Sequence, residues 1–186
     1  MTESQLYTLV IATLTAGLAN YPEFGTPAVK QAYQPRTAGA PSGDAILLSN
    51  QPLRRYGFMR RHNQWIPPAP PEPGRMVRTE TQNWEGVFQC NAQVLPPPQP
   101  KPLAPYTAGD LVSAASWILQ GDDGRGMLQS AGCGVLRVTE IRRPYFQNEQ
   151  NQFQASPSFD FTLQFEETKT FDISKVAAFA YRIFGV

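Results

Sequence analysis

The stretch Phe159-Asp-Phe-Thr-Leu-Gln-Phe165 alternates strictly between apolar and polar residues. Because successive side chains of a β-strand point to opposite faces of its sheet, this alternation predicts a strand with one buried face. A buried sheet face needs a second layer to pack against it. We therefore expect Phe159, Phe161, Leu163 and Phe165 to pack against the apolar stripes of helices elsewhere in the chain.

Residues 3–20 have the pattern of such a helix. Apolar side chains recur there every four positions, at Leu6, Val10, Leu14 and Leu18. This spacing places them on one face of a helix. Thr2 and Gln5 have the spacing of a capping box, and Asn20 and Pro22 are expected to end the helix.

A second helix is predicted to begin after Thr107, with Asp110 as the reciprocal capping residue. Its apolar stripe consists of Leu111, Ala115, Ile118 and Leu119. Three glycines are expected to interrupt it, namely Gly121, Gly124 and Gly126. A short turn at residues 127–131 is then expected to resume the helix, with Gly132 as its left-handed cap.

Four further segments have strand patterns: residues 45–48, 53–64, 75–95 and 135–141. Residues 147–154 are predicted to be a hairpin connection. Strands joined by hairpins favour an antiparallel sheet. The predicted fold class is therefore α+β, a mostly antiparallel β-sheet with a long hairpin, flanked by two helices, with proline-rich arms.

We expect one domain over residues 1–186 with three excursions. These are a loop at 21–44 with a short possible strand at 29–34, a hairpin tip at 67–74 and a proline-rich connector at 96–106. Proline accounts for 18 of the 186 residues, about twice its average share. Residues 174–186 fit either a helix or a strand.

The charge balance argues against a chain that coats nucleic acid or an acidic membrane. There are 16 basic and 15 acidic residues, for a net charge of +1, whereas such proteins are usually far more basic. The first residues lack the basic cluster of a signal peptide, and no apolar run reaches the ~18 residues of a membrane span. The expectation is a soluble protein made inside the cell, without a membrane partner.

The sequence predicts no enzyme, metal site or cofactor. The single histidine, His62, has no carboxylate or nucleophile near it in sequence. The glycine-rich loop at 121–126 follows a predicted helix, whereas a phosphate-binding loop follows a strand. Cys90 and Cys133 form no CxxC pair, which makes a zinc site or a disulfide scaffold improbable.

Six arginines form the one local charge anomaly: Arg54, Arg55, Arg60, Arg61, Arg75 and Arg78. Between positions 54 and 78 only Glu72 opposes them. Such a patch suits an acidic protein partner or phosphates, and Tyr56 and Trp65 between the arginines would allow bases to stack. It also suits a hairpin edge that charge protects against aggregation. The sequence leaves these alternatives open.

The layout resembles the tail terminators, or tail-completion proteins, of tailed bacteriophages. The likeness rests on the first helix, the long hairpin up to Thr79-Glu-Thr-Gln-Asn-Trp-Glu-Gly-Val-Phe-Gln-Cys90, and the helix near 108–120. It continues with residues 135–141 and the alternating strand that ends at Phe165. It covers roughly residues 45–173 as a pattern rather than as a sharp motif.

This resemblance implies a structural virion protein in the tail or neck, assembled in the host cytoplasm. It implies a homohexameric ring that caps the tail tube and joins it to the connector or head-closure protein, while DNA passes the lumen without specific binding. The arginines then face protein. We expect the ring interface to include Arg54, Arg55, Arg60, Arg61, Arg75, Arg78, Phe179, Tyr181 and Phe184. The alternatives are another neck component, a head-closure or connector protein, or a nucleic-acid-binding module that uses the basic hairpin at 54–78.

Overall fold

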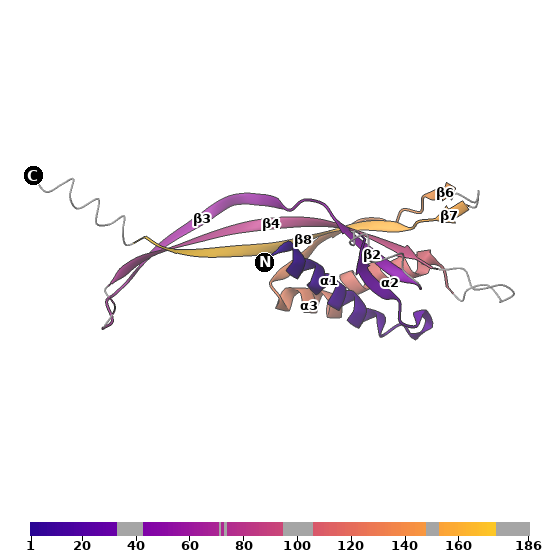
Figure 1. Cartoon of the computed structure of the whole chain (residues 1–186), viewed down its shortest axis with the longest axis horizontal. Coiled ribbons are helices and arrows are strands. Elements are labelled where there is room, and N and C mark those ends of the chain that lie inside the picture. Colours follow the sequence, from indigo (N-terminus) through magenta and orange to yellow (C-terminus); the bar gives the residue numbers. More distant parts are fainter. Residues whose placement is uncertain (33–42, 71, 73, 95–105, 148–152, 174–186) are drawn as a thin grey trace, which may run out of the picture. The chain divides into compact units, whose positions relative to one another are not determined.

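The computed structural model describes residues 1–32, 43–70, 72, 74–94, 106–147 and 153–173. Within this part of the chain there are a six-stranded, mostly antiparallel sheet, a two-stranded sheet and three α-helices (Figure 1). The predicted α+β fold class is confirmed. The predicted connector at 96–106 and residues 174–186 lie almost entirely outside the described residues; of the connector, only Tyr106 is described.

The chain divides into two compact units. Unit 1 consists of Met1–Arg54 and Glu85–Phe165, and unit 2 consists of Arg55–Trp84 and Glu166–Val186. The boundary falls inside two long strands, β4 (Arg75–Gln93) and β8 (Ser158–Asp172). Each unit is described by itself below.

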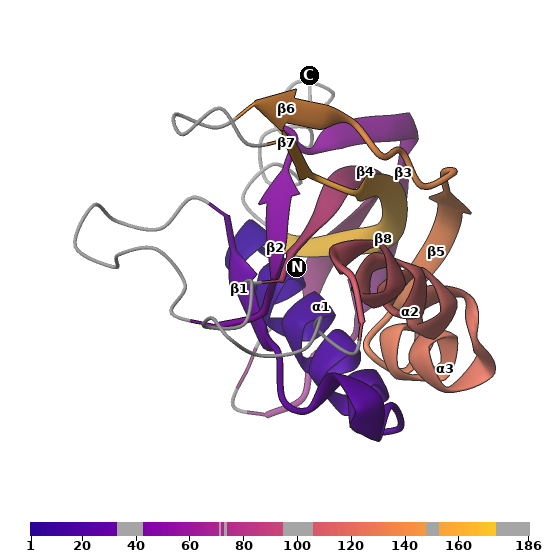
Figure 2. The same ribbon diagram turned by 90° about the vertical axis from the view of Figure 1, so that its right-hand side faces the viewer.

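Unit 1 contains all three α-helices, which lie on one side of its strands (Figure 2). They are α1 (Glu3–Leu18), α2 (Ala108–Gln120) and α3 (Asp122–Ser130). Both predicted capping boxes are present, one between Thr2 and Gln5 and the other between Thr107 and Asp110. The hydrogen bond from the Thr107 backbone N–H is the main reason that the pKa of Asp110 is lowered. Local sequence therefore sets where α1 and α2 begin.

The region of the three glycines differs from the prediction. Gly124 and Gly126 lie inside α3 instead of interrupting a helix, and only Gly121 separates α3 from α2. The predicted left-handed cap after this region is confirmed, since Gly132 has a φ of 79°. Helix propensity disfavours glycine by about 1 kcal/mol, and here the packing of α3 against α2 overrides it.

The strands of unit 1 follow the order β1-β2-β4-β8-β5. β2 (Ala45–Asn50) pairs antiparallel with β4, and β5 (Cys133–Val138) pairs antiparallel with β8. β1 (Ala28–Gln31) runs parallel to β2. β1 overlaps the possible strand predicted at 29–34 within the loop at 21–44, whereas the short 3-10 helix η1 (Pro22–Phe24) was not predicted.

The alternating stretch is confirmed as the centre of the core. Phe159, Phe161, Leu163 and Phe165 are all buried. The ring of Phe161 stacks on Phe88 of β4 with centroids 5.3 Å apart, and Tyr7 of α1 meets Phe88 edge-on. The side chains of β8, β4 and α1 thus form one continuous apolar layer.

β5 and β8 pair antiparallel, as the hairpin connection predicted at 147–154 requires, and residues 148–152 of that connection lie outside the described residues. β6 (Tyr145–Gln147) pairs antiparallel with β7 (Phe153–Ala155) as a separate two-stranded sheet of unit 1.

Unit 2 is a three-stranded ribbon. It consists of β3 (Arg54–Ile66) from Arg55 onward, residues 75–84 of β4 and residues 166–172 of β8, and we call it the ribbon. β3 pairs with β4. The predicted tip between them is closed by mutual backbone hydrogen bonds between Ala69 and Glu72.

None of the helices in the described part of the chain is long and apolar enough to cross a membrane. Cys90 and Cys133 are both free thiols in the interior of unit 1. Burial raises the pKa of each thiol above its ordinary value. At neutral pH both are therefore protonated and unreactive.

Candidate functional site

The predicted arginines all lie on the two strands of the long hairpin. Arg54 is the first residue of β3, and Arg55, Arg60 and Arg61 follow on the same strand. Arg75 and Arg78 lie on the part of β4 that belongs to the ribbon. Arg55, Arg60, Arg61, Arg75 and Arg78 thus belong to unit 2, whereas Arg54 belongs to unit 1.

Acidic side chains from outside the interval 54–78 pair with three of these arginines. Arg60 forms an ion pair with Glu166 of β8, and Arg61 Nε lies 3.1 Å from Glu80 Oε1 of β4. Arg75 Nη1 lies 4.0 Å from Asp172 Oδ2. The ribbon is therefore much closer to charge balance than its sequence interval suggests. Because the arginine of each pair is exposed, each pair contributes at most about 1 kcal/mol to stability.

Two other arginines are held by uncharged partners. The guanidinium of Arg55 lies 5.4 Å from the centre of the Trp84 ring, a cation–π contact. Arg78 Nε donates a hydrogen bond of 3.2 Å to Asn63 Oδ1. Both contacts join β3 to β4, so the arginines act first as cross-strand links within the ribbon.

Sequence reasoning missed the role of Gln82. This side chain is buried, and its amide nitrogen lies 2.9 Å from Tyr56 O and 3.3 Å from Gly57 O. Gly57 has a φ of 70°, in the left-handed region that favours glycine. Gln82 therefore holds an irregular point of β3 in place. A glycine inside a strand pattern was the only signal for it.

The ribbon has no apolar core among the residues that the structure describes. All the apolar side chains that are buried in the described part of the chain belong to unit 1, and none belongs to the ribbon. The ribbon instead exposes large apolar side chains, at Tyr56, Phe58, Met59, Trp65, Ile66 and Phe171. Phe58 is 99% exposed. Such a group of exposed apolar side chains marks an interaction surface.

β3 is also an edge strand in the described structure. All its residues from Arg54 to Ile66 are exposed, and β4 is the strand with which it pairs. A long edge strand presents unpaired backbone N–H and C=O groups and readily accepts another strand. Edge and side chains together make the ribbon the candidate assembly surface.

His62 is exposed on β3. In the described residues, no three His, Cys, Asp or Glu side chains group closely enough to hold a metal ion. The three predicted interface residues Phe179, Tyr181 and Phe184 lie outside the described residues.

A comparison with known protein families matches residues 5–175 to the E217 gateway protein gp29. The chain belongs to this gateway family. It is a phage neck-type family, so the prediction of a phage neck protein is confirmed at that level. Membership makes the chain a structural phage protein of the virion with a part in head–tail joining. No curated protein matches the chain.

Proposed function

We propose that this gateway-family protein forms a closed ring at the neck of a tailed phage. The ring caps the tail tube and joins it to the connector or head-closure protein, and neighbouring subunits meet through the ribbon. Six copies correspond to the ring that the resemblance to tail terminators implies. The role is one of assembly and not of catalysis.

The observation that carries this proposal is the ribbon without a core. A small sheet needs a packed apolar face for independent stability. The described part of the ribbon buries none of its apolar side chains, and Phe58 is almost fully in water. A neighbouring subunit would cover these side chains and would pair with the edge of β3.

Ring symmetry fits this arrangement. In a closed ring, two different patches of each subunit meet, one on each side. The ribbon supplies one such patch. Unit 1 has at β1 an edge strand of its own in the described sheet, and therefore a surface that could receive it.

The ion pairs favour protein over DNA as the partner of the arginines. Binding to DNA depends on basic side chains that neutralise phosphates and release counterions. Arg60, Arg61 and Arg75 already have acidic partners within the ribbon. This arrangement supports a lumen through which DNA passes without specific binding.

The test replaces Phe58 by Asp and measures mass by size-exclusion chromatography with light scattering, with or without tail tubes. The wild-type protein is expected to form rings alone or on tubes. Phe58→Asp should remain a folded monomer, because this side chain is 99% exposed and packs against nothing in the described part of its own chain. In infected cells, the variant should leave heads and tails unjoined.

The matched control is Leu136→Asp, which changes an exposed apolar side chain on β5 of unit 1. If the ribbon is the specific contact, this variant should assemble better than Phe58→Asp. The pair Arg60→Ala and Arg61→Ala should also impair assembly and leave folding intact. Normal rings and joined particles from Phe58→Asp would contradict the proposal, and tight, steeply salt-dependent binding to random-sequence DNA would favour the nucleic-acid alternative.

A further inference from the structure

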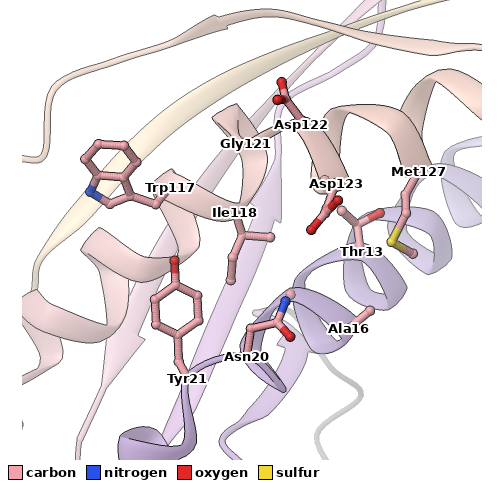
Figure 3. A pocket seen from close by; sticks show the side chains of 12 residues that line it. Thr13, Ala16, Asn20, Tyr21, Trp117, Ile118, Gly121, Asp122, Asp123 and Met127 are labelled. Carbon is pink, nitrogen blue, oxygen red and sulfur yellow. The ribbon is translucent and has the colours of Figure 1, made fainter.

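A groove of about 740 Å³ opens between the three helices of unit 1. Its floor includes Gly17 of α1 and Ile118 of α2, and its sides are formed by the end of α1, the junction of α2 with α3 and the first turns of α3. Figure 3 shows Trp117 and Tyr21 on one side of Ile118, and Asp123 and Met127 on the other.

Two large apolar side chains at this groove are in water. Trp117 is 72% exposed although it lies on the same helix as the buried Leu111 and Leu119, and Met127 is also exposed. A tryptophan on a helix surface beside a groove is the kind of anchor that dominates protein interfaces. The groove therefore offers an apolar seat, and nothing in the described part of unit 1 covers it.

One end of the groove is acidic. Asp122 and Asp123 line it, and both are exposed in the first turn of α3. Their negative charge interacts favourably with the dipole at the N-terminus of α3, and this interaction explains why two acidic residues occur there even without a ligand. Their charge nevertheless selects among ligands, because a basic segment would be attracted and an acidic one repelled.

Residues 174–186 of the chain have the complementary composition. They contain Lys175 and Arg182 and no acidic residue, and apart from these, Ser174 and Gly185 they are entirely apolar. The aromatic side chains are Phe179, Tyr181 and Phe184. A segment of this composition is too apolar to stay exposed to water, so we expect it to bind an apolar surface. Its two basic side chains favour a surface that also carries acidic groups.

We propose that residues 174–186 of one subunit dock in the groove between α1, α2 and α3 of a second copy. The aromatic side chains would pack on Trp117 and Met127, and the basic side chains would face Asp122 and Asp123. This inference rests on the proposed function, because a ring requires two different patches that meet between subunits. It assigns the groove as the receiving patch for this segment.

Binding is measured by the fluorescence anisotropy of a labelled peptide with the sequence of residues 174–186, added to the full chain that carries Phe58→Asp, whose grooves are not already filled by the segments of ring neighbours. Trp117→Ala should weaken binding at least tenfold, since the exposed ring is removed without disturbing the core. Asp122→Asn with Asp123→Asn should weaken it about threefold to tenfold. A control variant, Glu140→Gln, changes an exposed acid of unit 1 outside the groove and should bind as the chain with Phe58→Asp alone does.

Cross-linking identifies which copy supplies the segment. The full chain with Met127→Cys and Ala180→Cys is treated with a short bismaleimide, while the buried Cys90 and Cys133 stay protected. Links between chains, seen as a ladder of dimers and larger species, are expected. The matched control replaces Leu136 instead of Met127 and should give few links.

Links within one chain only would overturn docking on a second copy. If the peptide did not bind, or bound equally well with and without Trp117→Ala, the proposal that residues 174–186 bind in this groove would be wrong. Either failure can occur while the protein still forms rings and joins heads to tails, in which case the proposed function stands. Loss of rings in Phe58→Asp tests that function separately.

Discussion

The hydroxyl group of Tyr106 links three parts of unit 1 that are distant in sequence, namely those around Phe24, Asp44 and Tyr106 itself. Its hydroxyl donates to the Asp44 carboxylate and lies 3.1 Å from Phe24 O, and its ring meets Phe24 edge-on. Burial, together with the hydrogen bond to the negative Asp44, raises the pKa of Tyr106 to about 12. Residues that are distant in sequence thus depend on one neutral phenol.

Tyr106→Phe should lower the free energy of unfolding by about 1–2 kcal/mol at pH 8, because a hydrogen bond to a charged partner is lost. The pKa of Tyr106 is higher in the folded than in the unfolded protein, so the neutral phenol stabilises the fold. That contribution is complete below about pH 10 and is lost as the pH rises through 12. Urea unfolding at pH 8, 10 and 11.5 measures it. A wild type that lost no more stability than Tyr106→Phe over this range would contradict the role of the phenol.

Phe161 and Phe58 are the same residue type in opposite environments. Phe161 is fully buried between Phe88 and Phe159, whereas Phe58 is 99% exposed. Phe161→Ala should cost about 3–5 kcal/mol in urea unfolding. Phe58→Ala should stay within about 0.5 kcal/mol of the wild type. A cost below about 1 kcal/mol for Phe161→Ala would mean that the core is not centred on β8.

At the scale of elements, α2 and α3 pack so closely that only glycine fits at their contact. A Cβ atom on Gly124 would lie 1.9 Å from the backbone oxygen of Ile118. A Cβ on Gly17 of α1 would likewise lie 2.3 Å from Ile118 Cγ2. Ile118 is therefore the residue on which the three helices converge.

Gly124→Ala should destabilise the protein by about 1–3 kcal/mol, because the added methyl group forces α3 away from α2. Gly126→Ala is the matched control on the same helix. A Cβ at Gly126 meets nothing within 4 Å, so helix propensity should make this variant up to about 1 kcal/mol more stable. Thermal unfolding of the two variants measures the difference. Equal stabilisation by both would show that the helices do not pack this closely.

The same elements show what the sequence could predict. α1, α2 and the buried face of β8 follow from local signals, namely capping boxes and strict alternation, and all three are confirmed. α3 was predicted only as a turn at residues 127–131, because its glycines look like breaks unless the position of Ile118 is known. β1 was predicted only as a possible strand within a loop, since a strand of four residues has too few positions to show a period.

At the scale of the whole molecule, the location of the candidate interface was predictable and its electrostatics were not. Arg60 and Glu166 are 106 positions apart, so no sequence window contains both. They come together because β4 pairs with both β3, which carries Arg60, and β8, which carries Glu166. The division into a unit with a core and a ribbon without one likewise depends on where β4 and β8 leave unit 1, which alternation alone does not show.

The hairpin tip provides the last prediction. Gly74 allows Trp65 to lie close by, since a Cβ there would come within 2.5 Å of the indole, and Pro68 lies at the same place. Replacing residues 67–74 by Asn-Gly would join β3 to β4 by a two-residue turn that suits their twist. No buried apolar side chain of the described ribbon is lost. The free energy of unfolding should therefore change by less than about 1 kcal/mol. Ring formation and attachment to tails should nevertheless fail, because the shortened hairpin lacks the stiff proline-rich tip that would reach a neighbouring subunit. Circular dichroism and urea unfolding measure the fold, and electron microscopy of particles measures the joining. If this variant and a deletion of residues 179–186 both still gave normal rings and joined particles, assembly through the ribbon and this segment would be wrong.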